Sequence, residues 1–343
     1  MTPSRLVAAV ACLGALVAAG PPASARPAGP APYRCPARGP IPVGALAGAA
    51  RSGCSLVGRT VTAGRVAVVV PPAGMSVAGD GVGRHGDVAG LRLTNTGTSV
   101  VASRSDGLGG DGGWYLVPLT TSMPGTPVSL SGPVMLTAPR TGGTGACQDR
   151  TFNLEHHRWT SRLRYHVNLG HKPARFHRKT VIRQVKAANA NMRLGRTTCG
   201  KPRLRTPAAR YLGVTDKRPN IKLSGPTCGR PNSTNVVAFG NLPGGLLGWT
   251  CYWYDGAGRM MAADMVLDNG AALATHLPTP CVNSWDFEGT VTHEFGHVYG
   301  MAHTGSGHPN LTMQHLLKPC STYARTLGLG DWLGMNEMYG HRR

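Results

Sequence analysis

The sequence lacks the features that define several protein classes. None of its nine cysteines forms a CxxC pair, which argues against a cysteine-ligated structural zinc or a thioredoxin-like redox site. Aspartate and glutamate are scarce, 15 residues against 36 lysines and arginines, and aromatic residues make up only 6%. The basic residues are spread from Arg51 to Arg343 without interleaved aromatic side chains, which disfavours a specific nucleic-acid site. The positive charge still allows attraction to an anionic extracellular surface.

Long apolar runs are also scarce, and the one that stands out lies at the amino terminus. Arg5 precedes an apolar run over residues 6–19, and residues 23–25 read Ala-Ser-Ala, the small-residue pattern that a signal peptidase cuts after. The run is shorter than the roughly 20 residues that span a bilayer. We therefore predict a signal peptide over residues 1–25 and a secreted, extracellular protein with no transmembrane segment.

The cysteine count agrees with export. Removal of the signal peptide takes Cys12 with it, so eight of the nine cysteines remain, an even number as a disulfide-bonded secreted protein requires. Cys35 and Cys54 are the only two of these that precede residue 146, and we expect them to pair. The six later cysteines permit many pairings.

Composition changes along the chain predict two domains. Residues 26–42 are rich in proline, alanine and glycine and are typical of a linker. Residues 43–145 contain short valine-, leucine- and threonine-rich runs without sustained helical periodicity, so we expect a small β-rich domain, such as a sandwich. Its size suits a removed inhibitory propeptide, a folding aid and a retained accessory domain alike.

Residues 147–343 have a different pattern, in which strands and helices are mixed. Apolar residues at helical spacing predict a helix over residues 179–194, and a further helix carries a histidine motif near residue 293. Strands are predicted over residues 162–168, 220–223, 248–254 and 259–267. This order predicts an α+β fold instead of a doubly wound one.

The histidine motif is the strongest chemical signal in the chain. Residues 293–303 read HEFGHVYGMAH, which matches HExxHxxGxxH at every fixed position. His293 and His297 are four residues apart, so on a helix both imidazoles face one ion, and Glu294 lies beside it as a candidate general base. Gly300 allows a positive φ that ends the helix, and His303 can then return as the third ligand. Three histidine ligands leave the fourth position of a zinc ion open to water.

The motif and its surroundings resemble the metzincin zinc metallopeptidases, and within them the matrixin group, as in a bacterial-type secreted peptidase. Met313 follows His303 by ten residues, as the methionine of the metzincin turn does. Residues 286–292 resemble the start of a matrixin active-site helix, and residues 329–340 resemble the closing helix. The resemblance covers residues 147–341.

This resemblance implies a metzincin-like domain with a mixed twisted sheet, an active-site helix and a carboxy-terminal helix. It implies cleavage of internal peptide bonds in a protein or peptide substrate by zinc-activated water, with Glu294 as base. Met313 would support the site from below without binding the metal, and residues 263–267 would form the edge strand that pairs with substrate.

Some family features are absent from the sequence. Gln314-His315-Leu316 stands where matrixins have a proline and a tyrosine, and the family's second zinc cluster is not recognisable. We therefore predict one catalytic zinc ion and no cleavage preference. A calcium site stays open, since no motif places one.

Several weaker features were assigned as well. Cys281 and Cys320 flank the active-site helix and the methionine turn, so we expect them to pair. Cys35 faintly resembles a propeptide cysteine that blocks the zinc, although pairing with Cys54 explains it more simply. The aromatic residues of 249–254 are interpreted as core, and residues 105–113 as a turn. Four further histidines show no paired ligand spacing with nearby carboxylates and are expected to be solvated, namely His156, His157, His171 and His177.

Two other functions are compatible with the sequence. The chain could be an extracellular binding module in which zinc only stabilises the fold, or a zinc hydrolase of cell-wall peptides. The intact Glu294 argues against the first.

Overall fold

The computed structural model describes residues 35, 39–85, 90–104, 115–118, 145–155, 157–223, 226–305 and 307–340. These residues belong to one compact unit. The predicted signal peptide, the turn predicted over residues 105–113, and His156 lie outside the described residues. Within the described part of the chain, no helix is both long enough and apolar enough to cross a membrane.

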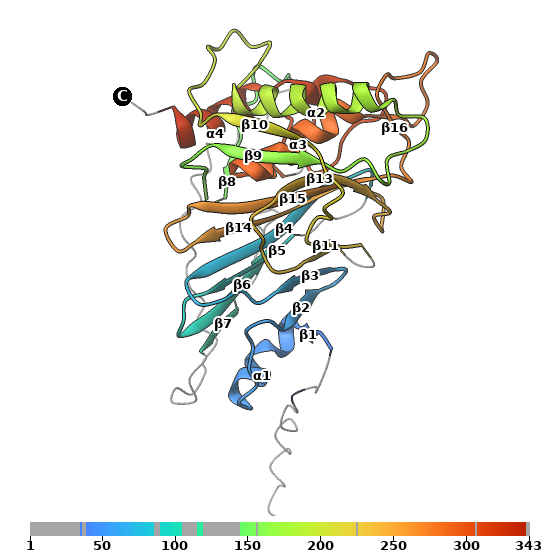
Figure 1. The fold of residues 1–343 in the computed structure, drawn as a ribbon. Coiled ribbons are helices and arrows are strands. Elements are labelled where there is room, and N and C mark those ends of the chain that lie inside the picture. The colour runs from blue at the N-terminus through green and yellow to red at the C-terminus, as the bar shows by residue number, and fades with distance from the viewer. Residues whose placement is uncertain are drawn as a thin grey trace, which may run out of the picture. The chain divides into compact units, whose positions relative to one another are not determined.

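The fold is α+β, as predicted, and is built on a mixed sheet of nine strands (Figure 1). The strand order is β10-β9-β13-β15-β14-β4-β5-β6-β7. The first four strands pair in parallel and the remainder in antiparallel fashion. The strands are β4 (Met75–Gly83), β5 (Leu91–Asn95), β6 (Ser99–Arg104), β7 (Tyr115–Pro118), β9 (Leu163–Val167), β10 (Ala209–Val214), β13 (Asn235–Gly240), β14 (Leu246–Asp255) and β15 (Met260–Asp268).

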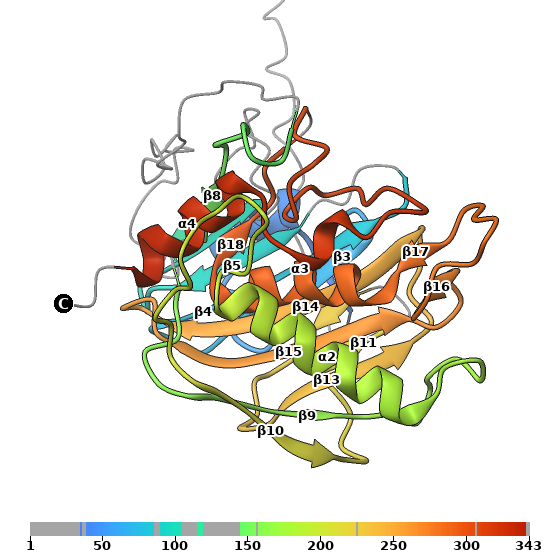
Figure 2. The same ribbon diagram turned by 90° about the horizontal axis from the view of Figure 1, so that it is seen from above.

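Three helices lie together on one face of this sheet (Figure 2). They are α2 (Arg178–Arg193), α3 (Phe287–Tyr299) and α4 (Leu329–Tyr339). In α2, Val181, Val185, Ala188 and Met192 recur at helical spacing, are fully buried and belong to the core between helices and sheet. Nearly all of α3 is buried, which explains why its sequence is apolar or uncharged around most of its circumference.

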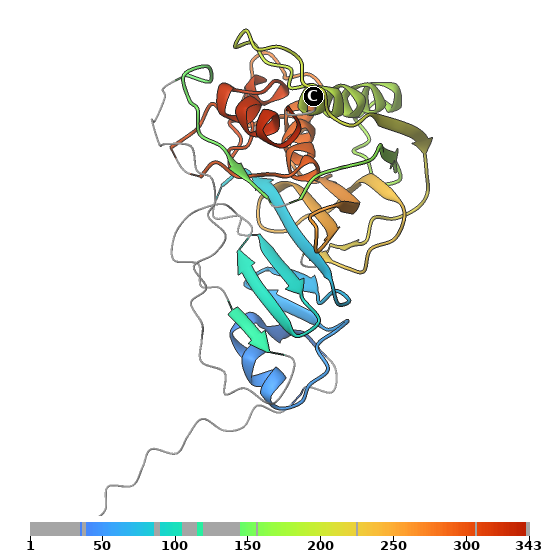
Figure 3. The ribbon, with the colours of Figure 1, turned by 90° about the vertical axis from the view of Figure 1, so that its left-hand side faces the viewer.

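A second, five-stranded sheet and a short helix lie on the side of the large sheet that faces away from α2, α3 and α4 (Figure 3). The sheet order is β1-β2-β3-β12-β11, and the helix is α1 (Leu46–Arg51). The strands are β1 (Ile41–Pro42), β2 (Thr60–Ala63), β3 (Val66–Val69), β11 (Ile221–Lys222) and β12 (Thr227–Cys228). The remaining short elements are η1 (Val43–Ala45), β8 (Asn153–Leu154), β16 (Leu273–Ala274), β17 (Trp285–Asp286), β18 (Met301–Ala302) and η2 (Tyr323–Arg325).

The amino-terminal segment and the later part of the chain share both sheets. In the large sheet β4 pairs with β14, and in the small one β3 pairs with β12. A second apolar core combines Val77 and Leu93 with Trp249 and Trp253. In the described residues before 119, the strands therefore share their sheets with the later part of the chain and do not close a sandwich of their own. The division into domains at residues 145–147 stays a prediction, because a shared sheet does not say which part folds alone.

One strand assignment made from the resemblance is wrong. Residues 263–267 belong to β15, which pairs with β13 on one side and β14 on the other, so they form an interior strand. The next strand outward is β14, and its open side is filled by β4. Sequence could not separate these two neighbouring strands, because both are buried along most of their length and read as apolar runs.

Four disulfide bonds join the eight cysteines after residue 25. The two expected pairs, Cys35–Cys54 and Cys281–Cys320, are both present. The other two are Cys147–Cys199 and Cys228–Cys251. Such a set fits an extracellular protein.

Candidate metal centre

Helix α3 begins and ends at strong local signals. Asp286 precedes its first residue, and the Asp286 carboxylate accepts a hydrogen bond of 2.7 Å from Gly289 N–H. Arg325 donates two further hydrogen bonds to the same carboxylate, 2.6 and 2.8 Å long. The helix ends at Gly300, whose φ of 103° is in the left-handed region, as predicted. These two ends fix the rotation of α3 and hence the direction in which its histidines point.

The three histidines of the motif converge on one point. His293 Nε2 lies 3.1 Å from His297 Nε2 and 3.1 Å from His303 Nε2, and all three residues have 0% exposure. His293 Nδ1 donates to Thr312 O at 2.7 Å, and His297 Nδ1 donates to Met301 O at 3.0 Å. Because a carbonyl only accepts, both Nδ1 atoms carry the proton and both Nε2 atoms present lone pairs.

Facing lone pairs repel one another unless a cation lies between them. Within the described residues, these three histidines are the one cluster of at least three histidine, cysteine or acidic side chains that could hold a metal ion. The carbonyl partners of Nδ1 orient the rings as outer partners of metal ligands do. The residues therefore fit a metal ion with nitrogen ligands.

Burial keeps these imidazoles neutral. It lowers the pKa of His297 to about 3 and the pKa values of His293 and His303 well below their usual 6.5. Mutual repulsion between the histidines lowers the pKa values of His293 and His303 further. Neutral imidazole is the form that binds a metal, so the site is ready to bind at neutral pH.

Glu294 lies beside the histidines with both carboxylate oxygens engaged. Thr250 Oγ1 on β14 donates to Oε2 at 2.6 Å, and Val82 N–H on β4 donates to Oε1 at 3.1 Å. Burial raises the pKa of Glu294 to about 8, and the two donors partly offset this rise. A carboxyl group with such a pKa can hold a proton or release it near neutral pH.

A glycine in β14 makes room for this carboxyl group. A Cβ at Gly248 would lie 2.5 Å from Glu294 Oε1 and 2.8 Å from its Cδ, closer than atoms can approach. Any larger side chain at residue 248 would displace the Glu294 side chain.

Met313 packs beneath the histidines against α3. A Cβ on Gly296 would lie 2.1 Å from Met313 Sδ, so the thioether occupies the space left by that glycine. The turn that carries Met313 is held by Asp331 of α4, which accepts from Thr312 N–H at 2.7 Å and Met313 N–H at 3.0 Å. Since Thr312 O orients His293, Asp331 supports a metal-site histidine through the turn.

All five predicted site residues are thus brought together, and their catalytic roles stay predictions. The prediction that His157 is solvated is wrong. His157 is 2% exposed, its Nε2 lies 3.0 Å from His297 O, and its ring packs against Tyr252 at 4.5 Å between centroids. The sequence offers no ligand pattern there, because His157 acts through a backbone atom 140 residues away. His171 is exposed, as expected, and so is His177.

The amino-terminal segment also contributes to the site, which sequence reasoning missed. Asp80 Oδ1 of β4 lies 3.5 Å from His303 Nδ1, and both side chains have 0% exposure. Gly83 N–H donates to His315 O at 3.0 Å, and Leu317 N–H donates to Gly83 O at 3.2 Å. Strand β4 therefore passes directly over the histidine cluster.

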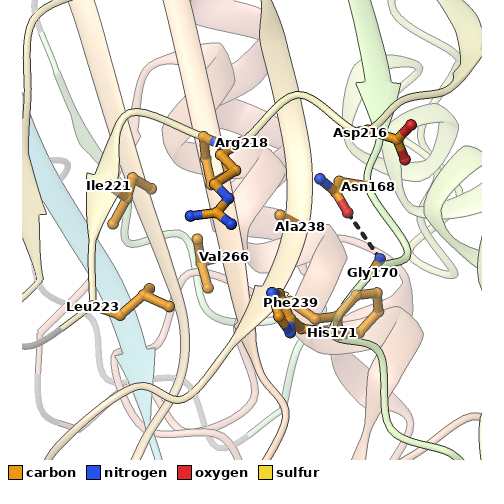
Figure 4. A pocket seen from close by; sticks show the side chains of 11 residues that line it. Asn168, Gly170, His171, Asp216, Arg218, Ile221, Leu223, Ala238, Phe239 and Val266 are labelled. Atoms are coloured by element: carbon orange, nitrogen blue, oxygen red, sulfur yellow. Dashed lines mark hydrogen bonds between the residues drawn. The ribbon is translucent and has the colours of Figure 1, made fainter.

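A separate cavity of about 630 Å³ lies on the opposite face of the large sheet (Figure 4). Ala238 and Val266, which are paired across β13 and β15, form part of its floor. Arg218 extends across it, while Asn168 closes one end by accepting from Gly170 N–H at 2.8 Å. None of the three histidines lines this cavity, so it is distinct from the metal centre.

No family model matches the chain, and no curated protein matches it.

Proposed function

We propose that this chain is a secreted, zinc-dependent endopeptidase of the metzincin type, most similar to the matrixins. The observation that carries the proposal is the convergence of the Nε2 atoms of His293, His297 and His303 next to the Glu294 carboxyl group. Nitrogen ligands of a tetrahedral zinc ion, at about 2.0–2.1 Å from the metal, lie about 3.3 Å apart. The observed 3.1 Å separations are close to that spacing.

The proposed chemistry divides between the metal and the chain. A zinc ion held there would polarise the peptide carbonyl and lower the pKa of a water molecule, so that the water could lose a proton and attack at neutral pH. Glu294 would accept the proton of the attacking water and then deliver it to the leaving amine. Thr250 would hold the Glu294 carboxyl group against β14 during both transfers, and Met313 would keep the turn packed beneath the histidines.

A structural role for zinc is the main alternative, and one observation favours it: all three histidines and Glu294 have 0% exposure. A buried, closed zinc site is typical of structural zinc. A hydrolase of cell-wall peptides would use the same site and differ only in substrate.

The test compares peptide fragments released from an unfolded protein and from cell-wall peptides by mass spectrometry. The chain is assayed as the zinc-loaded protein, after chelation and after zinc is restored, each before and after graded trypsin treatment, so that a covered site does not hide activity. We expect internal cleavage of the protein substrate that stops on chelation and returns with zinc. Cleavage of cell-wall peptides alone would assign the second substrate class, and a bound zinc without any cleavage would leave the structural role.

A further inference from the structure

The metal centre is covered by a strand from the amino-terminal half of the chain. β4 pairs with β14 in antiparallel register, with Asp80 opposite Thr250 and Val82 opposite Gly248. The other edge of β14 is paired with β15. An extended peptide that adds to β14 by backbone hydrogen bonds can therefore do so only at the edge that β4 fills.

The end of β4 is held from two sides. On one side Gly83 faces Leu246 of β14, and on the other it exchanges hydrogen bonds with His315 and Leu317, just after the Met313 turn. The chain at Gly83 thus lies between a sheet edge and a loop that borders the metal site. A bound peptide that reached the histidines would need this same position.

β4 also contacts the chemical groups of the site. Val82 N–H donates to Glu294, and the Asp80 carboxylate faces the Nδ1 of His303. Carbonyl oxygens accept hydrogen bonds from the Nδ1 atoms of His293 and His297, and the Asp80 carboxylate lies in the corresponding position beside His303, 3.5 Å from its Nδ1. The strand thereby engages both the candidate base and a candidate ligand.

We infer that β4 is a built-in occupant of the peptide-binding groove, and that the metal centre opens only when β4 leaves the edge of β14. The inference rests on the proposed function for the identity of the groove. In the described structure the metal centre is therefore closed to peptide substrates, and displacement of β4 controls access to it.

The shared core opposes that displacement. Trp249 and Trp253 of β14 are fully buried in a core that includes Val77 of β4, so displacement of β4 would expose part of these large apolar side chains to water. Arg92 of β5, the next strand, forms an ion pair with Glu155. Spontaneous opening is therefore rare, and metal exchange through it is slow.

The close packing of β4 on β14 allows a substitution that should weaken their pairing without changing the histidines or Glu294. A Cβ at Gly81 would lie 2.3 Å from Gly248 O, a backbone atom that cannot move aside, so Gly81→Ala should push β4 away from β14 at the metal site. Val82→Pro is the second variant, because it removes the N–H that Glu294 accepts from. Ser76→Ala is the matched control, since Ser76 lies at the far end of β4, where its hydroxyl bonds Thr94 at 2.8 Å.

The test uses the full chain loaded with zinc, and has two readouts. The first is the rate of zinc transfer to the chromogenic chelator 4-(2-pyridylazo)resorcinol, and the second is hydrogen exchange of the β14 amides. We expect slow transfer and protected amides in the wild type and in Ser76→Ala. In Gly81→Ala and Val82→Pro we expect transfer to be about tenfold faster, the factor for a clash or lost hydrogen bond of this kind, with faster exchange in β14.

Near-ultraviolet circular dichroism establishes that each variant is folded. Folded Gly81→Ala and Val82→Pro proteins that release zinc at the wild-type rate and keep β14 protected would overturn the inference, as would rapid zinc transfer from the wild type. Failure of the chain to bind zinc at all would instead reject the proposed function, and the exchange of the β14 amides would still decide whether β4 is the cover.

Discussion

Thr250 donates a hydrogen bond of 2.6 Å to Glu294, and neither side chain is exposed to solvent. The bond joins β14 to α3 and favours the charged form of the carboxyl group. Because Thr250 is 44 residues from Glu294, no motif indicates this contact.

Thr250→Val removes this hydrogen bond while keeping the shape of the side chain. The pKa of Glu294 should rise, so the acidic limb of the pH–rate profile should move to higher pH by about one unit, which lowers the rate at pH 7 by about tenfold. Thr290→Val is the control, since Thr290 Oγ1 donates to Asp286 O, just before the start of α3, and not to Glu294. Profiles that coincide for wild type and Thr250→Val would show that Thr250 does not tune the base.

Gly248→Ala should impair turnover without loss of metal. The added Cβ would lie 2.5 Å from Glu294 Oε1, so the carboxyl group must move, at a cost of about 1–3 kcal/mol for overpacking. Gly256→Ala in the turn after β14 is the control, since the nearest atom to its Cβ would be 3.6 Å away. Zinc content and peptide cleavage rate are measured together, and normal cleavage by Gly248→Ala would contradict the placement of Glu294 against β14.

Zinc should stabilise the fold through the three histidines. Free zinc at 100 to 1,000 times its dissociation constant should add about 3–4 kcal/mol to the free energy of unfolding, and chelation should remove it. His293→Ala, His297→Ala and His303→Ala should each melt at one temperature with or without zinc, while His171→Ala, at an exposed site, should respond to zinc as the wild type does. A zinc-dependent melting temperature in the three variants would place the ion elsewhere.

The sequence predicts those contacts of the metal centre whose residues are close together in the chain, and not those between distant residues. The motif, Gly300 and Met313 lie within 21 residues of one another, and helical periodicity alone brings His293 and His297 to one face. Helix α2 is likewise predicted by apolar residues at helical spacing. Asp80 and Val82 could not be predicted in this way, because they reach the site through strand pairing over more than 150 residues.

The same distinction explains the one wrong strand assignment, that of residues 263–267 to a sheet edge. An apolar run in the sequence predicts a buried strand, but it does not show which strands pair with it or in what register. The pairing of β4 with β14 could therefore not be predicted. The two disulfide predictions are confirmed, for different reasons. Cys54 is the one other cysteine between the predicted signal peptide and residue 146, so Cys35 had a single candidate partner there. Cys281 and Cys320 flank the helix that the histidine motif predicts.

Asp264 predicts a pH dependence of stability away from the metal centre. Burial raises the pKa of Asp264 to about 6, against an unfolded value near 3.8, although Asn220 and Val236 N–H groups oppose the rise. Between these two pKa values the folded state holds a proton that the unfolded state has released. The contribution of Asp264 to stability is therefore fully present below about pH 4 and falls by about 3 kcal/mol as the pH rises through 6.

Chemical unfolding between pH 4 and 7 measures this slope, which Asp264→Asn should reduce. Asp255→Asn is a control of opposite sign, because hydrogen bonds from Arg259 lower the pKa of the partly exposed Asp255 carboxyl group. Its stabilising effect is present at higher pH and is lost as pH falls. An unchanged slope in Asp264→Asn would show that this carboxyl group ionises normally in the folded protein.

The most direct test of the proposed function is the cleavage rate of Glu294→Gln at full zinc occupancy, with Glu288→Gln on the same helix as the matched control. The amide keeps the shape of the side chain and leaves the three histidines in place, but it cannot accept the proton of the attacking water. We predict one bound zinc per chain in both variants, wild-type cleavage in Glu288→Gln, and a rate lower by about 10²–10⁴-fold in Glu294→Gln. Cleavage by zinc-loaded Glu294→Gln at the wild-type rate would contradict the account.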